Sequence, residues 1–225
     1  MGKLGYKNIL IDFDDTIVDF YDAEEWAFHY MANVFNHKAT KDDFLTFKKI
    51  NHQHWEAFQQ NKLTKSEVLS ERFVNYFKHH QMEVDGHRAD VLFRNGLAEA
   101  KVKYFDQTLE TIVDLYIVTN GVTETQKRRL NQTPLHKYIK KIFISEETGY
   151  QKPNPEFFNY VFNDIGEDER QHSIIVGDSL TSDILGGINA GIATCWFNFR
   201  GFDHNPGIIP DYEINSWKQL NDIVR

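Results

Sequence analysis

Two aspartates one residue apart, Asp12 and Asp14, follow a run of apolar residues near the start of the chain. Side chains alternate along an extended strand, so both carboxylates are expected on one side of it, with Phe13 on the other. Like charges this close repel unless a cation lies between them or one carboxyl keeps its proton. A divalent cation satisfies the first condition, and a nucleophile paired with an acid or base uses the second. A loop with two solvated aspartates is the alternative.

Thr119, Asn120 and Gly121 end a second apolar run, where a helix is expected to begin. A hydroxyl, backbone N–H groups and the positive end of a helix dipole together make an anion site. For an isolated motif of three residues, an ordinary capped turn is the simpler interpretation.

Lys152 lies just before another predicted helix start, where Pro153 and Pro155 limit the directions in which its ammonium can point. A phosphoryl group near several aspartates needs such a cation, although most lysines are simply solvated.

Two more carboxylates follow the later apolar run HSIIVG. Asp178 is expected at the tip of a strand, facing Asp12 across adjacent strands, and it would complete a site of hard oxygen ligands. Magnesium favours one or two carboxylates, a carbonyl, waters and a substrate phosphate. Asp183 opens the next helix and could equally complement that helix's dipole.

The elements that must position these groups alternate between strands and helices. A continuous apolar run at 7–13 predicts a fully buried strand, and from about residue 104 strands alternate with helices. This pattern predicts an α/β fold: a doubly wound parallel sheet with ligands at the carboxyl ends of its strands. Helices are expected over 105–113, from about 123, over 153–162 and through ILGGINA; strands are expected over 114–121, 141–145, 172–178, 193–198 and near 212–214.

Residues 19–103 interrupt that series with apolar residues at helical spacing. They predict three or four amphipathic helices, with breaks near 36–38, 60–62 and 85–86. We expect an all-helical cap domain at 19–103, inserted after the first strand of a core domain formed by 1–18 and 104–225.

Composition excludes several classes of function. The 225 residues are 41% hydrophobic and carry a formal net charge of −8, which argues against non-specific nucleic-acid binding. Cys195 is the single cysteine, so an intramolecular disulfide is excluded and a reducing compartment is favoured. The first apolar run is too short for a signal peptide and none is long enough for a membrane span, so a cytoplasmic location is expected. The oligomeric state stays open.

Taken in order, these motifs resemble the haloacid dehalogenase superfamily of phosphohydrolases: DxDxT, a hydroxyl after the second strand, a lysine, and GDxxxxD. The resemblance implies that Asp12 is the nucleophile that takes the phosphoryl group. It also implies that Asp14 protonates the leaving oxygen and later activates water. Thr119 and Lys152 correspond to catalytic groups that bind the phosphoryl group and balance its charge.

The same resemblance implies one Mg²⁺ ion. Its ligands would be Asp12, the backbone carbonyl of Asp14, and Asp178, with Asp183 supporting them through water or a hydrogen bond. Asn120 and Gly121 would bind the substrate phosphate beside Thr119 and Lys152.

Three stretches resemble the pyrimidine nucleotidases of this superfamily: INHQHWEAFQQNKLT, ISEETGYQKPNPEFF and GGINAGIATCWFN. The resemblance implies a 5′-nucleotidase whose partner is a small phosphorylated substrate, a pyrimidine nucleoside monophosphate. Asp15 is a departure, because many relatives carry glycine there. A sugar-phosphate phosphatase or a phosphomutase is the alternative. A haloacid dehalogenase needs neither the acid Asp14 nor a metal, and a phospho-accepting signalling domain is usually much shorter.

Base recognition is expected from the cap, because the core contacts only the phosphate. Asn51 and Trp55 lie four residues apart on one face of a predicted helix, and Phe20 and Tyr21 stand at the entry to the cap. An aromatic ring for stacking and an amide for base edges suit a pyrimidine. Trp55 could instead belong to the core of the helical bundle.

Overall fold

The computed structural model describes residues 5–105 and 113–224. The chain divides into two compact units, each described by itself below. The α/β unit comprises Met1–Asp19 and Lys103–Arg225, and the helical unit comprises Phe20–Val102. The helix expected over 105–113 lies almost entirely outside the described residues.

The α/β unit is built on a six-stranded sheet in which the pairing strands are all parallel. This confirms the predicted fold class, a doubly wound parallel α/β sheet. In spatial order the strands are β5 (Ile139–Ile144), β4 (Asp114–Thr119), β1 (Asn8–Ile11), β6 (Ser173–Gly177), β7 (Ala193–Phe197) and β8 (Tyr212–Ile214).

Strand β1 lies between β4 and β6, and its apolar residues Ile9, Leu10 and Ile11 are fully buried. The chain runs outward from β4 on one side of β1 and from β6 on the other, so the strand order reverses at β1. A crevice forms outside the carboxyl ends of the strands at such a switch point. Ile11 pairs with Ile117 and with Val176, which brings the ends of these three strands level.

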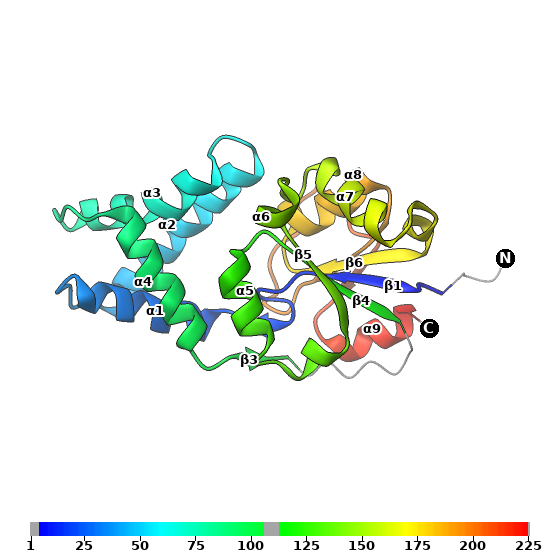
Figure 1. Cartoon of the computed structure of the whole chain (residues 1–225), viewed down its shortest axis with the longest axis horizontal. Coiled ribbons are helices and arrows are strands. Elements are labelled where there is room, and N and C mark those ends of the chain that lie inside the picture. Colours follow the sequence, from blue (N-terminus) through cyan, green and yellow to red (C-terminus); the bar gives the residue numbers. More distant parts are fainter. Residues whose placement is uncertain (1–4, 106–112, 225) are drawn as a thin grey trace. The chain divides into compact units, whose positions relative to one another are not determined.

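Helices cover both faces of the sheet: α7 and α8 lie on one face and α9 on the other (Figure 1). Asn154 is the N-cap of α7 and Pro155 its first residue, as expected. The sequence analysis missed α9. The helices are α5 (Thr123–Leu130), α6 (Ser145–Thr148), α7 (Pro155–Ile165), α8 (Leu185–Ala190) and α9 (Trp217–Val224), with shorter turns η1 (Pro134–Lys137), η2 (Glu167–His172) and η3 (Leu180–Ile184).

Helix α8 packs closely on the sheet because it carries glycine where it meets the strands. A Cβ on Gly187 would lie 2.5 Å from Ile175 Cγ2 and 2.7 Å from Thr194 Cγ2, closer than any real contact. Gly187 therefore serves packing between helix and sheet, whereas a Cβ on Gly186 would meet Phe158 and Pro153.

Four helices form the helical unit: α1 (Tyr21–Val34), α2 (Lys41–Gln59), α3 (Lys65–His79) and α4 (Gly86–Glu99). Thr40 and Thr64 close capping boxes at the starts of α2 and α3, and Asp85 caps α4. The core of the unit is aromatic, with Phe28, Phe44, Phe47, Phe73 and Tyr76 fully buried.

A short antiparallel pair, β2 (Val18–Asp19) with β3 (Lys103–Tyr104), lies where the helical segment leaves and rejoins the α/β unit. Each strand has two residues, too few for an alternating pattern to show in the sequence. That the helical unit acts as a cap domain, with bounds 19–103, stays a proposal.

Candidate active site

The turn after β1 separates the two leading aspartates. The strand was expected to run to residue 13, but it ends at Ile11. The Phe13 carbonyl accepts hydrogen bonds from the backbone N–H groups of Ile17 (3.0 Å) and Val18 (3.1 Å), so the chain turns there. Asp15 has a φ of +58°, a left-handed conformation that aspartate tolerates better than most residues and glycine adopts freely. This explains why either residue can stand at that position.

Lys152 is the cation nearest to Asp12. Its Nζ lies 2.6 Å from Asp12 Oδ1, 2.6 Å from Asp183 Oδ1 and 2.7 Å from the Val118 carbonyl oxygen. The lysine is 1% exposed, so its ammonium donates three hydrogen bonds out of contact with bulk water. Burial alone would lower the pKa of Lys152, but the carboxylates of Asp12 and Asp183 outweigh it and raise that pKa. Lys152 therefore keeps its charge.

Asp12, Asp178 and Asp183 converge at the ends of β1 and β6. Each has a carboxylate oxygen within 4.8 Å of those of the other two. Burial raises the pKa of Asp12 to about 8, although Lys152 opposes that shift, and the Asp183 and Asp14 carboxylates add to it. Burial and the neighbouring carboxylates likewise raise the pKa of Asp178. Among the described residues, three carboxylates thus face one ammonium, and the site is short of positive charge.

These three residues fit a magnesium ion. Their ligand atoms are hard oxygens, and a divalent cation would remove the excess negative charge that the raised pKa values report. Gly177 leaves the necessary space, because a Cβ there would lie 2.2 Å from the Asp183 carboxylate. The structure brings Asp12, Asp178 and Asp183 together as the sequence predicted. Coordination by the Asp14 backbone carbonyl stays a prediction.

The side chain of Asp14 is held by helix α5 and not by the other aspartates. The Arg129 guanidinium donates to Asp14 Oδ1, and the Gln126 amide donates to Asp14 Oδ2 at 2.8 Å. Gln126 also donates to the Thr119 hydroxyl at 2.9 Å, so one amide links the predicted acid to the predicted phosphate-binding hydroxyl. Arg129 and Gln126 are 1% and 2% exposed. Sequence reasoning missed both residues. Their spacing of three residues puts these two long polar side chains on one face of the helix, and that face must pack inward, which was a signal for a role in the site.

The motif after β4 is arranged differently from the expected open anion site. The Gly121 N–H donates to the Thr119 hydroxyl at 3.1 Å. Asn120 pairs with the backbone of Lys152: its amide donates to the Lys152 carbonyl, and its oxygen accepts the Lys152 N–H, both at 2.9 Å. Asn120 thus fixes the segment that carries the buried ammonium.

Three residues support Asp178: Thr16, the threonine of the DxDxT motif, and two tryptophans that sequence reasoning missed. The Thr16 hydroxyl accepts the Asp178 N–H at 3.1 Å, and the Trp196 indole donates to the Asp178 carbonyl at 2.8 Å. The Trp217 indole in turn donates to the Thr16 carbonyl at 3.0 Å. Helix α9 therefore supports the loop that follows β1, a contact that no local sequence pattern could have revealed.

In the helical unit, Asn51 is buried in a charged network instead of being presented for base recognition. Its amide donates to Glu24 Oε1 at 2.7 Å, and its oxygen accepts from Arg72 Nη1 at 2.9 Å. Arg72 also forms a buried ion pair with Asp90 at 2.7 Å. Trp55 is half-buried, with its ring edge-on to Phe58. The amide proposed to read a base edge thus bonds within its own bundle.

A doubly wound parallel sheet whose central strands end in carboxylates around a buried lysine defines the class: an α/β hydrolytic enzyme of the haloacid dehalogenase type. Residues 9–197 match the family described as haloacid dehalogenase-like hydrolase, and the chain belongs to that family. This confirms the superfamily and the enzyme class inferred from the sequence motifs.

The chain is 42% identical to the putative HAD-hydrolase YfnB of Bacillus subtilis, over 97% of this chain and 95% of that protein. It is 33% identical to the pyrimidine 5′-nucleotidase PynA of Streptococcus pneumoniae, over 97% of this chain and 95% of PynA. It is 31% identical to the pyrimidine 5′-nucleotidase YjjG of Escherichia coli, over 91% of this chain and 96% of YjjG. A crystal structure of YfnB bound to magnesium, described as revealing interdomain movement, superposes with a TM-score of 0.90 at 40% identity, covering 98% and 99% of the two chains.

Within the part of the chain that the structure describes, no helix combines the length and apolar character that crossing a membrane requires.

Proposed function

We propose that this protein is a magnesium-dependent phosphoric monoester hydrolase that acts through a phosphorylated Asp12. The observation that carries the proposal is the buried Lys152 ammonium between Asp12 and Asp183, beside the carboxylate of Asp178. A simple structural ion pair needs one carboxylate; here the charge is balanced only when a further cation joins the group.

In the first step an Asp12 oxygen attacks phosphorus, and the bond from phosphorus to the ester oxygen breaks. Asp14 gives its proton to the departing oxygen, so the alcohol leaves neutral. In the second step water attacks the phosphorus of the Asp12 acyl phosphate, Asp14 takes a proton from that water, and inorganic phosphate leaves with Asp12 regenerated. A bound Mg²⁺, held by Asp12 and Asp178, would neutralise the phosphoryl oxygens.

The chain's own groups set the geometry of these steps. Lys152 favours the ionised form of Asp12, against the effect of burial, and adds positive charge beside the phosphoryl group. Arg129 and Gln126 contact the two Asp14 carboxylate oxygens and so set the direction in which this carboxyl points. The Thr119 hydroxyl accepts its hydrogen bond from Gln126, so its own proton can be donated to a phosphoryl oxygen.

The substrates that we propose are pyrimidine nucleoside 5′-monophosphates, such as UMP, dUMP and dTMP. The names of PynA and YjjG, which align with over nine-tenths of this chain, support this class. The single cysteine, typical of a reducing compartment, supports action in the cytoplasm on a small phosphorylated metabolite.

The experiment is a phosphate-release screen over nucleoside monophosphates and sugar phosphates, with and without Mg²⁺. We expect pyrimidine nucleotides to give the highest kcat/KM and the Asp12→Asn variant to be inactive while still folded. A clear preference for sugar phosphates would replace the nucleotidase with a sugar-phosphate phosphatase. Transfer to a second sugar hydroxyl would indicate a phosphomutase, and halide release from 2-haloacids without phosphate release would indicate a dehalogenase.

A further inference from the structure

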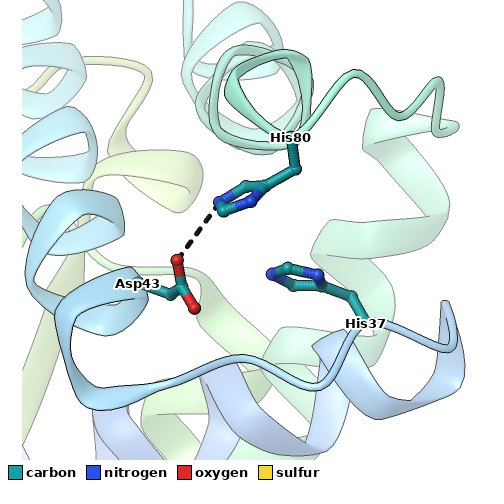
Figure 2. A group of neighbouring side chains, drawn as sticks. All are labelled: His37, Asp43 and His80. Atoms are coloured by element: carbon teal, nitrogen blue, oxygen red, sulfur yellow. Dashed lines mark ion pairs between the residues drawn. The ribbon is translucent and has the colours of Figure 1, made fainter.

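A second group of potential metal ligands lies in the helical unit, far in sequence from Asp12. His37 is in the turn between α1 and α2, Asp43 is in the first turn of α2, and His80 is the C-cap of α3. One ligand atom of each residue lies within 4.8 Å of those of the other two. Figure 2 shows both imidazoles with a nitrogen on the side that faces the Asp43 carboxylate. All three residues belong to the same compact unit.

The Asp43 carboxylate is fixed by the capping box at the start of α2. Its Oδ2 accepts hydrogen bonds from the Thr40 N–H and the Thr40 hydroxyl, each at 2.7 Å. This leaves Oδ1 directed at His80, whose Nε2 lies 3.3 Å away. The backbone hydrogen bond from Thr40 lowers the pKa of Asp43, so the group is an anion in the neutral range. Metal ligands are commonly oriented in this way by a hydrogen bond to their other atom.

The two imidazoles crowd each other. Their ring centroids are 4.4 Å apart, and the Tyr76 hydroxyl lies 2.8 Å from His37 Nε2. Burial and the neighbouring His80 lower the pKa of His37, so this ring is neutral near pH 7. Burial raises the pKa of Tyr76, so its hydroxyl keeps its proton. Neutral imidazole beside a carboxylate is the form of this group that binds a metal.

The separation of His80 and Asp43 also suits a tetrahedral ion. Two ligands bound at about 2.0–2.1 Å with tetrahedral angles lie about 3.4 Å apart, and the His80–Asp43 separation is 3.3 Å. Two nitrogens and one oxygen are the donor set of zinc and similar transition metals, whereas magnesium prefers oxygen alone. The side chains of His80 and Asp43 are 27% and 20% exposed, so an ion and a completing water can reach them.

We propose that His37, Asp43 and His80 form a transition-metal site, of the zinc type, that ties the α1–α2 turn and the start of α2 to the end of α3. The site stabilises the helical unit and is separate from the magnesium-type carboxylates of the α/β unit. It does not depend on the catalytic proposal, because none of its residues belongs to that machinery.

The alternative to a metal site is a plain ion pair between protonated His80 and Asp43. The strength of this ion pair changes with pH in the opposite direction to the strength of metal binding. Among the described residues, the titratable groups against the two rings are the other ring, Asp43 and the Tyr76 hydroxyl, and the Phe77 ring packs beside His37. The ion pair needs a protonated ring, so it strengthens as pH falls. Metal binding requires deprotonated rings, so it weakens as pH falls.

The experiment uses the full-length protein with saturating Mg²⁺ present and titrates Zn²⁺ calorimetrically, with Co²⁺ as a spectroscopic probe. We expect binding of one Zn²⁺ with at least micromolar affinity, and strong visible absorption from tetrahedral Co²⁺ instead of the weak absorption of an octahedral oxygen site. Losing a residue that only orients a metal ligand typically lowers metal affinity about 10–100-fold. His37→Ala and His80→Ala should each lower Zn²⁺ affinity by more than this. Asp43→Asn should weaken binding in the same direction.

His79→Ala is the matched control, since His79 is the exposed neighbour of His80 and lies outside the group. It should bind Zn²⁺ as the wild type does. Zn²⁺ should also raise the melting temperature of the wild type at pH 7.5 and much less at pH 5.5, which does not depend on any variant folding well. Purely octahedral Co²⁺ spectra, or zinc affinity unchanged in the His37→Ala/His80→Ala double variant, would overturn the proposal.

Discussion

The Arg129 guanidinium donates a hydrogen bond to Asp14, the residue that we propose as the general acid. Arg129 is 1% exposed and packs over the Phe13 ring, so packing as well as the Asp14 carboxylate holds the cation in place. The partner of the acid is thus a rigid group on α5, and the direction of the Asp14 carboxyl depends on a residue outside the four sequence motifs.

Removing this anchor should affect proton delivery more than phosphate binding. We expect Gln126→Met and Arg129→Met to lower kcat/KM for a nucleoside monophosphate about 10–100-fold, within the range of a mispositioned general acid. Hydrolysis of p-nitrophenyl phosphate, whose leaving group needs no proton, should fall much less. Arg128→Met is the control, because that neighbouring arginine is half-exposed and pairs only loosely with Glu124 at 4.0 Å. Equal losses on the two substrates would speak against a positioning role.

Asp14→Asn keeps the shape of the side chain but removes its proton. Since ribose 5′-alkoxide is a far poorer leaving group than nitrophenolate, we expect loss of about 10²–10⁴-fold on UMP and a smaller loss on the aryl ester. Steady-state kinetics on both substrates measure the ratio. A uniform loss would assign Asp14 to binding instead of acid catalysis.

Asp15 should be replaceable by glycine but not by alanine. Both substitutions remove the 2.8 Å ion pair with Arg200, so the difference between them reports the left-handed backbone at φ +58°. Alanine in that conformation is disfavoured by about 1–2 kcal/mol. Urea denaturation should show Asp15→Gly as the more stable of the two variants by about that amount. Equal midpoints would mean that the turn adjusts its conformation.

Cys195 should make stability fall at alkaline pH. Burial raises the pKa of its thiol to about 12, whereas an unfolded cysteine titrates near about 8.5. Between these values the folded chain holds a proton that the unfolded chain loses, so the free energy of unfolding decreases as pH rises, by up to about 1.4 kcal/mol per pH unit. Chemical denaturation of the wild type and of Cys195→Ala from pH 8 to 10 tests this. The slope difference between them should disappear below about pH 8, and identical slopes throughout would contradict the assignment.

Asn51→Ala should destabilise the helical unit and leave the ranking of bases unchanged. The substitution leaves Glu24 and Arg72 each without one buried partner, which costs about 1–3 kcal/mol per group. Gln53→Ala, an exposed neighbour on α2, is the control. Thermal melts report stability, and competition between UMP, dTMP and AMP reports specificity. If Asn51→Ala had wild-type stability but preferred the three nucleotides in a different order, Asn51 would have a role in base recognition after all.

Sequence reasoning placed the site because its chemistry lies at strand ends, which a short motif marks locally. Asp12, Lys152, Asp178 and Asp183 could each be assigned to the end of an apolar run or the start of a helix, and the parallel topology then brings those ends together. The bonds of Gln126, Arg129 and Trp217 could not be inferred in the same way. They join residues 112, 115 and 201 positions apart, and only the packing of α5 and α9 decides these contacts.

Asn51 shows the opposite error. Its spacing from Trp55 correctly predicted a shared helix, but helical periodicity does not distinguish an amide directed to a ligand from one that satisfies a buried arginine. Only the positions of Glu24 and Asp90 on the other helices settle that question.

The hydrogen bond from Trp217 to the Thr16 carbonyl has a consequence for synthesis on the ribosome. The loop that carries Asp12 and Asp14 is synthesised early, but Trp217, which bonds to its Thr16 carbonyl, lies 201 residues later in the chain. The helical unit, in contrast, is contained within Phe20–Val102 and makes its core from those residues alone. In a nascent chain, all residues of the helical unit are therefore present long before the residue that bonds to the Asp12 loop has been synthesised. A truncation that removes only the last helix would leave the motifs intact, yet it would strip Thr16 of the bond that holds the catalytic turn.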